Sequence, residues 1–434
     1  MRLRACSGTV GTTRSHLSDS SGLPRSKLNS LPALTGARFF AAFAVVVWHF
    51  GMRSIAAVAH WLAVPLDAAP LAVSFFYVLS GAVLTWGCTE ANGLPTRPAP
   101  TFWLQRAARV LPAYLLALAV ASVLFATHLW RLDPSAACAE RIVVSVLAAL
   151  LLVQAFAAPL GAGLNTPGWS VSCEAFFYLL WPRLVGSLRS SRVGLPWRRG
   201  LWLWLAALVL PLASIAIMRL GLLPEGPFLM LHQTVSGNDV LAQTVSYFPP
   251  FRVPEFLRGI VVGHALRVTP ARARSAALDT RRELGLLTAL LACCTALGAG
   301  LSSRLSGIGL ADRVVVQSGV LGPLFALLIW QLARGDGALR RALSSSVLLA
   351  LGEASYALYI LQEPMFELVS IARKRLAPAA SEQPVFVTYL VLLLVASFAV
   401  HRFVELPVRS RILSWFASRR ASHPRVARIS DYPA

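Results

Sequence analysis

The chain has 434 residues, of which 56% are hydrophobic and 14% are charged, and its formal net charge is +21. Soluble domains average about 25% charged residues, so the composition argues against a soluble globular protein. The arginines cluster in short loops between apolar segments, where the positive-inside rule places them, so the positive charge does not indicate a nucleic-acid partner. We expect an all-α integral membrane protein with membrane lipid as its surroundings.

Residues 1–30 are rich in Ser, Arg and Gly and lack the apolar core of a signal peptide, so we interpret them as a flexible cytoplasmic tail. One membrane domain is expected over 31–407, followed by a basic cytoplasmic tail over 408–434. Apolar segments suited to membrane-spanning helices lie at about 33–51, 62–87, 110–130, 142–160, 169–184, 199–222, 246–266, 284–302, 313–334, 347–370 and 385–404.

Charge at the two ends of the chain predicts their side of the membrane. Arg25 and Lys27 precede the first apolar segment, and several arginines from Arg409 onward follow the last, so both termini are expected in the cytoplasm. Two cytoplasmic ends require an even number of crossings, whereas eleven segments are found. We therefore predict about ten transmembrane helices, with one segment that does not cross.

The loop charges indicate which segment fails to cross. All basic loops but one lie on the cytoplasmic side if either 142–160 or 169–184 does not span the bilayer. The second segment is short and contains Glu174, which makes a re-entrant or half-buried segment plausible there. The exception is the loop 371–384, whose basic residues then fall on the outer side.

Two polar residues stand out in the first segment. Arg38 and His49 are eleven residues apart, about three helical turns, so they project from one face about 16 Å apart along the axis. A charged residue at a helix centre costs roughly 2.5–3.5 kcal/mol on insertion scales, so such residues tend to face a polar interior. From the residues alone, Arg38 can equally reach the headgroups, and His49 can be a hydrogen-bonded core residue.

Two arginines in the basic stretch after the second segment are spaced as neighbours on a helix. Arg106 and Arg109 are three residues apart, so their side chains share one helical surface. Two guanidinium groups on one face suit bidentate binding of a phosphate or pyrophosphate. Arginines that contact lipid phosphates on the cytoplasmic side explain the spacing equally well.

Carboxylates inside apolar segments form the third group. Glu174 lies in the stretch Trp169-Ser-Val-Ser-Cys-Glu, and an intramembrane carboxylate is by default a functional-site hypothesis. A structural ion pair between Glu174 and an arginine is the competing interpretation. Arg252 and Glu255 are three residues apart, so they can neutralise each other.

Several motifs are absent from the sequence. The six cysteines show no Cys-x-x-Cys and no metal-ligand spacing, so no metal site is expected. There is no Gly-x-Ser-x-Gly elbow, no phosphate-binding loop that ends in Gly-Lys-Ser/Thr and no His-Glu-x-x-His. Hydrolases of the elbow type, nucleotide-driven pumps and zinc proteases therefore have little support.

Taken together and in order, the motifs from about Leu34 to Pro407 resemble acyltransferase family 3, the membrane O-acyltransferases that modify bacterial polysaccharides, lipopolysaccharide and some small glycosides. The resemblance rests most specifically on four motifs. They are Arg38 with ten residues before His49, Arg106-Ala-Ala-Arg109, Trp169-Ser-Val-Ser-Cys-Glu174 and Gly352-Glu-Ala-Ser355-Tyr356.

The resemblance implies an enzyme of the bacterial cytoplasmic (inner) membrane that takes an acyl group from acyl-CoA, with acetyl-CoA the expected donor. The acceptor is then a hydroxyl of a glycan or glycoside, and no permanently bound cofactor is expected. By the same resemblance, Arg106 and Arg109 engage the CoA phosphates, and His49 is the catalytic base. Arg38 supports the same site, and Glu174 is a further matching position.

One residue departs from the family pattern. Gln362 stands where family members often carry His, after Ser-Tyr-x-x-Tyr-x-x, which puts the acceptor or the activity in question. Two other classes of function stay open at this point. The first is a transporter or flippase for a glycan or lipid-linked intermediate, with Arg38, His49, Glu174 and Glu255 along its path. The second is a structural subunit of an envelope complex.

Overall fold

The computed structural model describes residues 31–90, 92–161, 163–186, 196–223, 228–230, 233–269, 275–316 and 318–422. The expected N-terminal tail, 1–30, and the last part of the expected C-terminal tail lie outside the described residues. The described chain is helical, as expected, except for one short antiparallel hairpin in which Phe228 pairs with Val235 and an isolated bridge between Thr89 and Pro95.

The elements follow one another along the chain with short connections. They are α2 (Pro32–Phe50), α3 (Met52–Val58), α4 (His60–Leu66), α5 (Leu71–Cys88), α6 (Ala99–Leu132), α7 (Ala136–Leu150), the 3₁₀ helix η1 (Gln154–Phe156), α8 (Ala158–Gly161), α9 (Gly168–Gly186), α10 (Pro196–Arg219), β1 (Phe228–Met230), β2 (Gln233–Val235), α11 (Gly237–Tyr247), α12 (Pro249–Val268), α13 (Ala276–Gly298), α14 (Leu301–Ser306), α15 (Ala311–Val316), α16 (Gly322–Arg334), α17 (Ala338–Leu343), α18 (Ser346–Leu376), α19 (Glu382–Val400), the π-helix η2 (His401–Glu405) and α20 (Leu406–Ser422).

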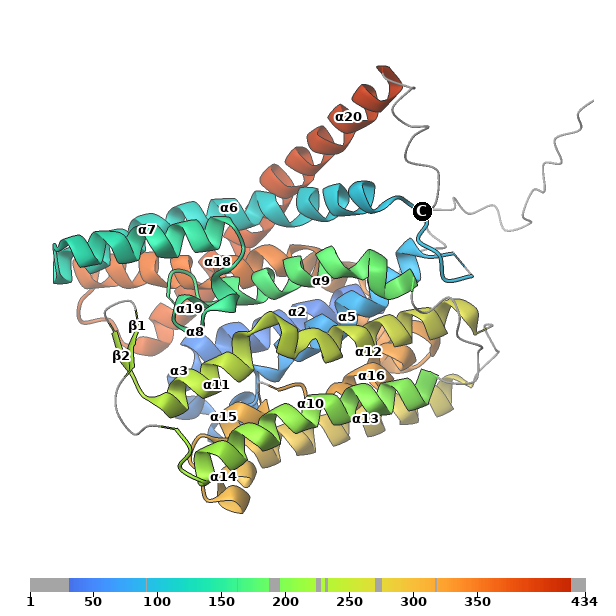
Figure 1. The fold of residues 1–434 in the computed structure, drawn as a ribbon, viewed down its shortest axis with the longest axis horizontal. Coiled ribbons are helices and arrows are strands. Elements are labelled where there is room, and N and C mark those ends of the chain that lie inside the picture. Colours follow the sequence, from blue (N-terminus) through green and yellow to red (C-terminus); the bar gives the residue numbers. More distant parts are fainter. Residues whose placement is uncertain are drawn as a thin grey trace, which may run out of the picture. The chain divides into compact units, whose positions relative to one another are not determined.

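Figure 1 shows most of the long helices of Pro32–Val400 lying roughly along one direction, with α20 oblique to them and with α3, α8, α14 and the β1–β2 hairpin toward one end. Among the described residues, five helical stretches are long and apolar enough to cross a membrane. They are Pro32–Phe50, Leu71–Cys88, Ala99–Leu132, Arg198–Arg219 and Glu382–Arg419. The protein is therefore a multi-pass membrane protein, while the ten crossings and the sides of the termini stay predictions.

The helix lengths bear on which segment does not cross. At 1.5 Å per residue, the 15 residues of α7 span about 22 Å, which is short of the roughly 30 Å hydrocarbon core. The chain then turns at Leu152, whose backbone is left-handed with φ 57°. The 19 residues of α9 span about 28 Å. Both helices are shorter than the hydrocarbon core, and neither is among the five described stretches that are long and apolar enough to cross, so which of 142–160 and 169–184 crosses stays a prediction.

Small residues hold α5 and α12 close together. A Cβ built on Gly259 of α12 would lie 2.1 Å from the carbonyl oxygen of Val78, and one on Gly81 of α5 would lie 2.3 Å from that of Phe256. Close backbone approach at small residues is the usual way in which membrane helices pack without a hydrophobic driving force. This contact fixes α5, which carries Ser80, against the rest of the bundle.

The helices α2 and α18 lie side by side and run in the same direction. Gly352 of α18 packs on the carbonyl oxygen of Thr35 near the start of α2, where a Cβ would come within 2.0 Å. Farther along both helices, the side chains of His49 and Gln362 are in hydrogen-bond contact. The two helices thus form a shared wall along which polar groups from both are placed in register.

Candidate functional site

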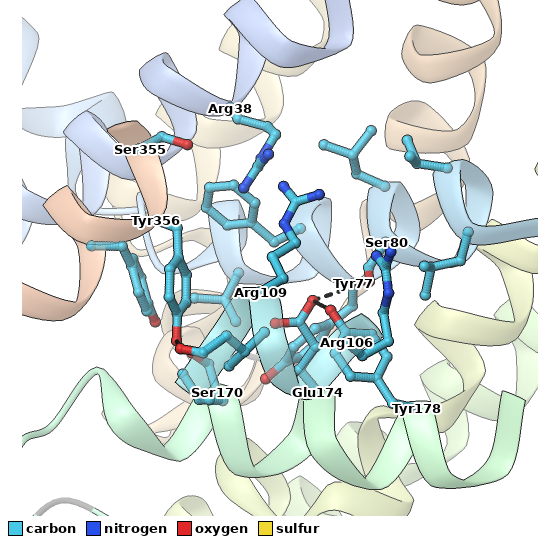
Figure 2. Close-up of a pocket in the computed structure, with 18 residues that line it drawn as sticks. Arg38, Tyr77, Ser80, Arg106, Arg109, Ser170, Glu174, Tyr178, Ser355 and Tyr356 are labelled. Atoms are coloured by element: carbon cyan, nitrogen blue, oxygen red, sulfur yellow. Dashed lines mark hydrogen bonds between the residues drawn. The ribbon is translucent and has the colours of Figure 1, made fainter. Parts of the chain in front are cut away.

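Side chains from five helices line one pocket, which we call the arginine pocket (Figure 2). Its polar lining comprises Arg38 of α2, Tyr77 and Ser80 of α5, Arg106 and Arg109 of α6, Ser170, Glu174 and Tyr178 of α9, and Ser355, Tyr356 and Tyr359 of α18. Apolar side chains such as Val73, Phe76 and Val110 complete the wall. The structure thus brings together four of the five sequence-predicted site residues, which lie as far as 136 residues apart in the chain.

Glu174 is held by two hydroxyl groups. Ser80 Oγ donates to Glu174 Oε1 at 3.1 Å, and the Tyr178 hydroxyl, one helical turn farther along α9, donates to the same oxygen (Figure 2). Tyr178 is itself fixed from α6, because Trp103 Nε1 donates to its carbonyl oxygen at 3.0 Å. Among the described residues, no arginine nitrogen lies within 4.0 Å of Glu174, so the ion-pair interpretation does not describe this carboxylate.

The three arginines give the pocket a surplus of positive charge. Figure 2 shows the guanidinium groups of Arg38 and Arg109 pointing toward one another, with Arg106 on the other side of Glu174. Three cations face one carboxylate, which leaves two positive charges unbalanced. The Arg106 side chain lies over the Phe102 ring, 5.9 Å from its centroid, and its buried Nε has no hydrogen-bond partner among the described residues. Guanidinium groups with unused donors in an apolar-walled pocket suit a phosphate or carboxylate ligand.

Aromatic side chains of α18 form another side of the arginine pocket. Tyr356 donates its hydroxyl to the carbonyl oxygen of Val110 at 3.1 Å, which ties α18 to α6 beside the arginines. Tyr359, one turn farther, meets Phe76 in an edge-to-face contact with the ring centroids 6.1 Å apart. Both residues line the arginine pocket, and Tyr359 precedes Gln362 by three residues on α18.

His49 does not line the arginine pocket. It lies at the other end of α2 and lines a second cavity, which we call the histidine pocket. The charged residues of this cavity are Arg53, Arg373, Lys374 and Glu382, and its aromatic wall includes Phe50, Phe366 and Phe386. Arg38 and His49 are eleven positions apart, about 16 Å along the axis of α2, and they line two different cavities.

A chain of hydrogen bonds fixes the ring of His49. Its Nδ1 lies 2.9 Å from Gln362 Oε1, and Gln362 Nε2 donates to the carbonyl oxygen of Tyr359 at 2.7 Å. Because the amide nitrogen is used on Tyr359, the amide oxygen faces His49 and must accept, so Nδ1 carries the hydrogen. The lone pair of His49 then resides on Nε2. Gln362 is fully buried. It is the residue at which the chain departs from the family pattern, and its hydrogen-bond partner is His49.

The same hydrogen bonds connect the two pockets. Tyr359 lines the arginine pocket, and Gln362, which holds His49, follows it by three residues, about 4.5 Å along the helix. The loop before α9 is attached to the same turn, since Asn165 Nδ2 donates to the carbonyl oxygen of Ile360 at 3.1 Å. Its neighbour Thr166 bonds Glu363 through both its backbone nitrogen and its hydroxyl.

The second charged motif of the sequence forms a buried pair outside both pockets. Arg252 Nη2 lies 3.1 Å from Glu255 Oε2, and both side chains are 1% exposed. Arg252 also donates to Ser74 Oγ at 3.0 Å and lies over the Tyr77 ring. These contacts give the pair a role in holding α12 against α5.

Sequence reasoning missed several residues that shape the site. Tyr178 follows Glu174 by one helical turn, and that spacing was a usable signal for a hydrogen-bonded pair. Ser80 and Tyr359 come from distant helices, and no local pattern marks them as partners. In the part of the chain that the structure describes, no group of three or more His, Cys, Asp or Glu residues is arranged to hold a metal ion.

Comparisons with known proteins agree with the motifs. The family model described as an acyltransferase domain matches residues 31–402. Acyltransferase MdmB from Streptomyces mycarofaciens is 31% identical over 355 residues, which cover 76% of this chain and 77% of that protein. No solved structure matches the chain. These matches favour the enzyme over the transporter and the structural subunit, and the chain belongs to the acyltransferase 3 family and is an acyltransferase.

Proposed function

We propose that the protein is a membrane O-acyltransferase that moves an acyl group, most readily acetyl, from acyl-CoA to a hydroxyl of a cell-envelope or exported glycan. One observation carries this proposal. A histidine whose Nε2 holds the lone pair is linked, through Gln362 and Tyr359, to a pocket with surplus positive charge. The first group suits proton removal from a hydroxyl, and the second suits the phosphates of CoA.

The donor occupies the arginine pocket in this proposal. Arg106 and Arg109 bind the CoA phosphates, with Arg38 adding a third positive charge from α2. Glu174, held by Ser80 and Tyr178, keeps the arginines spread apart and ready for the ligand. The pantetheine arm then runs past Tyr359, which brings the thioester toward His49.

His49 is the general base for the transfer. As the acceptor oxygen bonds to the thioester carbonyl carbon, Nε2 takes the hydroxyl proton, and the Gln362 oxygen stabilises the Nδ1–H of the resulting imidazolium. The tetrahedral intermediate collapses with cleavage of the carbon–sulfur bond, and His49 returns the proton to the departing CoA thiolate. The products are the acyl ester and free CoA. The transfer is direct and uses no acyl-enzyme.

The proposed topology places the two substrates on opposite sides of a bacterial cytoplasmic membrane. With ten crossings and both termini in the cytoplasm, α2 begins on the cytoplasmic side and ends on the outer side. The arginine pocket near the start of α2 then receives cytoplasmic acyl-CoA, and the histidine pocket near its end faces the acceptor. The pantetheine arm carries the acyl group from one pocket to the other, and only the acyl group is transferred to the acceptor.

Acetyl-CoA turnover by the purified protein tests this proposal. Protein in detergent is given acetyl-CoA with and without a panel of glycosides, and free CoA and acetylated glycoside are measured together. We expect saturable acetyl-CoA binding, and CoA release that rises with acceptor and equals the ester formed. Protein that is folded but neither binds acetyl-CoA nor releases CoA with any acceptor contradicts the proposed donor.

A further inference from the structure

The charged residues of the histidine pocket are mostly cations. Arg53, Arg373 and Lys374 line it together with one carboxylate, Glu382, which leaves a surplus of two positive charges beside His49. Arg53 and Lys374 are exposed and Arg373 is partly buried, so water or an anion that enters the pocket can compensate these charges. The pocket therefore has the electrostatic character of an anion site, and it is separate from the arginine pocket.

The individual contacts show where the surplus lies. Arg53 Nη1 and Glu382 Oε1 are 3.6 Å apart, so these two charges offset each other. Arg373 Nη2 donates to the carbonyl oxygen of Ala380 at 2.8 Å, a contact that closes the turn from α18 to α19 but leaves its charge unpaired. Lys374 forms no hydrogen bond or ion pair with any described residue. Arg373 and Lys374 thus provide the two uncompensated charges.

The position of these cations is unusual for a membrane protein. In the proposed topology the end of α18 lies on the outer side, where the positive-inside rule predicts few basic residues. A cluster there is explained if it binds a ligand. The same cavity also has an aromatic wall, in which the rings of Phe50 and Phe366 stack with centroids 4.2 Å apart. Apolar walls with a few placed charges are typical of small-molecule sites.

On the basis of the proposed function, we infer that the histidine pocket binds an acceptor that carries an anionic group, a phosphate or a carboxylate, close to the hydroxyl that is acylated. Lys374 and Arg373 bind this group, and the aromatic wall covers the apolar face of the acceptor. The contacts orient one hydroxyl toward Nε2 of His49. The anion of the acceptor thereby determines which hydroxyl reacts.

The test compares matched acceptors with matched variants. Acetyl transfer from acetyl-CoA is measured in nanodiscs of zwitterionic lipid for a neutral glycoside, its sugar phosphate and the corresponding uronic acid. The variants are Lys374→Gln, which removes an unpaired charge, and Glu382→Gln, which increases the surplus. Arg375→Gln is the control, because Arg375 is an exposed neighbour that does not line the pocket. Binding of acetyl-CoA is measured for every variant.

We expect the phosphate or the uronic acid to have a KM about tenfold lower than the neutral glycoside. Lys374→Gln should raise KM for the anionic acceptors about tenfold with little change for the neutral one, Glu382→Gln should lower it, and Arg375→Gln should change neither. Equal KM values for all acceptors, or the same loss in Arg375→Gln, overturn the inference. The assay is repeated in nanodiscs that contain anionic lipid. If this lipid lowers acetyl transfer to all acceptors alike, the cations bind lipid phosphate and the inference is overturned.

This design separates the inference from the function on which it rests. If acetyl-CoA binds and is turned over with neutral acceptors only, the acyl transfer stands and the anionic acceptor is rejected. If acetyl-CoA neither binds nor releases CoA with any acceptor, the proposed donor fails and the acceptor comparison loses its basis.

Discussion

The imidazole of His49 and the side-chain amide of Gln362 are joined by a 2.9 Å hydrogen bond, although 313 residues separate them in the chain. Gln362 should therefore be a positioning residue. We predict that Gln362→Leu lowers kcat about 10- to 100-fold, because the ring loses its tautomer and orientation. The KM for acetyl-CoA should change little. Steady-state kinetics measure both parameters.

Gln362→Glu is the matched variant, because it keeps the side-chain size and an oxygen that accepts from Nδ1. It should retain more activity than Gln362→Leu, and its pH–rate profile should shift relative to that of the unmodified protein, because a carboxylate stabilises the imidazolium. A folded Gln362→Leu protein with an unchanged kcat contradicts the positioning role.

The arginine pocket leads to a prediction about the donor. Arg106→Gln and Arg109→Gln should each raise the Kd for acetyl-CoA about tenfold, since hydrogen bonds to charged groups contribute roughly 1.5–3 kcal/mol. The difference in Kd between the variants and the unmodified protein should become smaller at high salt, because salt screens the charges. Calorimetric titration measures it, with Arg97→Gln as the control, because Arg97 is exposed in the connection just before α6 and does not line the pocket.

S-acetyl-pantetheine, which lacks the nucleotide and its phosphates, identifies the group that the two arginines bind. If they bind the phosphates, this shorter donor should bind weakly and equally to the unmodified protein and to both variants. A loss of affinity for S-acetyl-pantetheine as large as that for acetyl-CoA would place the arginines on the acyl or pantetheine part instead.

The close contact between α5 and α12 predicts a loss of stability. Gly259→Ala should destabilise the protein by about 1–3 kcal/mol, because its Cβ would overlap the carbonyl oxygen of Val78 at 2.1 Å. Gly87→Ala is the control on α5, since a Cβ there meets no atom within 4 Å. Thermal unfolding in detergent should show a lower Tm for Gly259→Ala only, and equal Tm values would contradict the packing.

The ten-crossing topology predicts which loops a membrane-impermeant maleimide reaches in intact cells. In a background without the native cysteines, Pro378→Cys, in the exposed turn after α18, should react from outside. Arg97→Cys, in the connection before α6, should react only after the membrane is opened. Labelling of both cysteines in intact cells would require a different number of crossings between them, and labelling of Arg97→Cys alone would require the opposite orientation in the membrane.

Much of the arginine pocket was predictable from the sequence. Arg106 and Arg109 share a helical face because of their spacing, whereas the family resemblance placed Arg38 with His49 and gave Glu174 only as a further matching position. The sequence also indicated a predominantly helical membrane protein. Both predictions depend on local periodicity or on composition, which are properties that a single sequence carries directly.

The separation of His49 from the arginine pocket was not predictable. A spacing of eleven residues places His49 and Arg38 on one helical face, but it does not show that the two side chains line different cavities. The contact of His49 with Gln362 depends on how α2 packs on α18, and no local pattern encodes it. The break after α7 at Leu152 was missed as well, since its left-handed backbone is unusual for a leucine.

Acetyl transfer by His49→Ala tests the central claim most directly. Acetyl-CoA binding and acceptor-dependent CoA release are measured side by side for the unmodified protein and His49→Ala, with thermal unfolding to verify that the variant is folded. The account predicts that acetyl-CoA binds to both with similar affinity and that turnover falls about 10²- to 10⁴-fold in His49→Ala. A folded His49→Ala protein that transfers acetyl at the unmodified rate would contradict the account, because the proton of the acceptor would then be removed by another group.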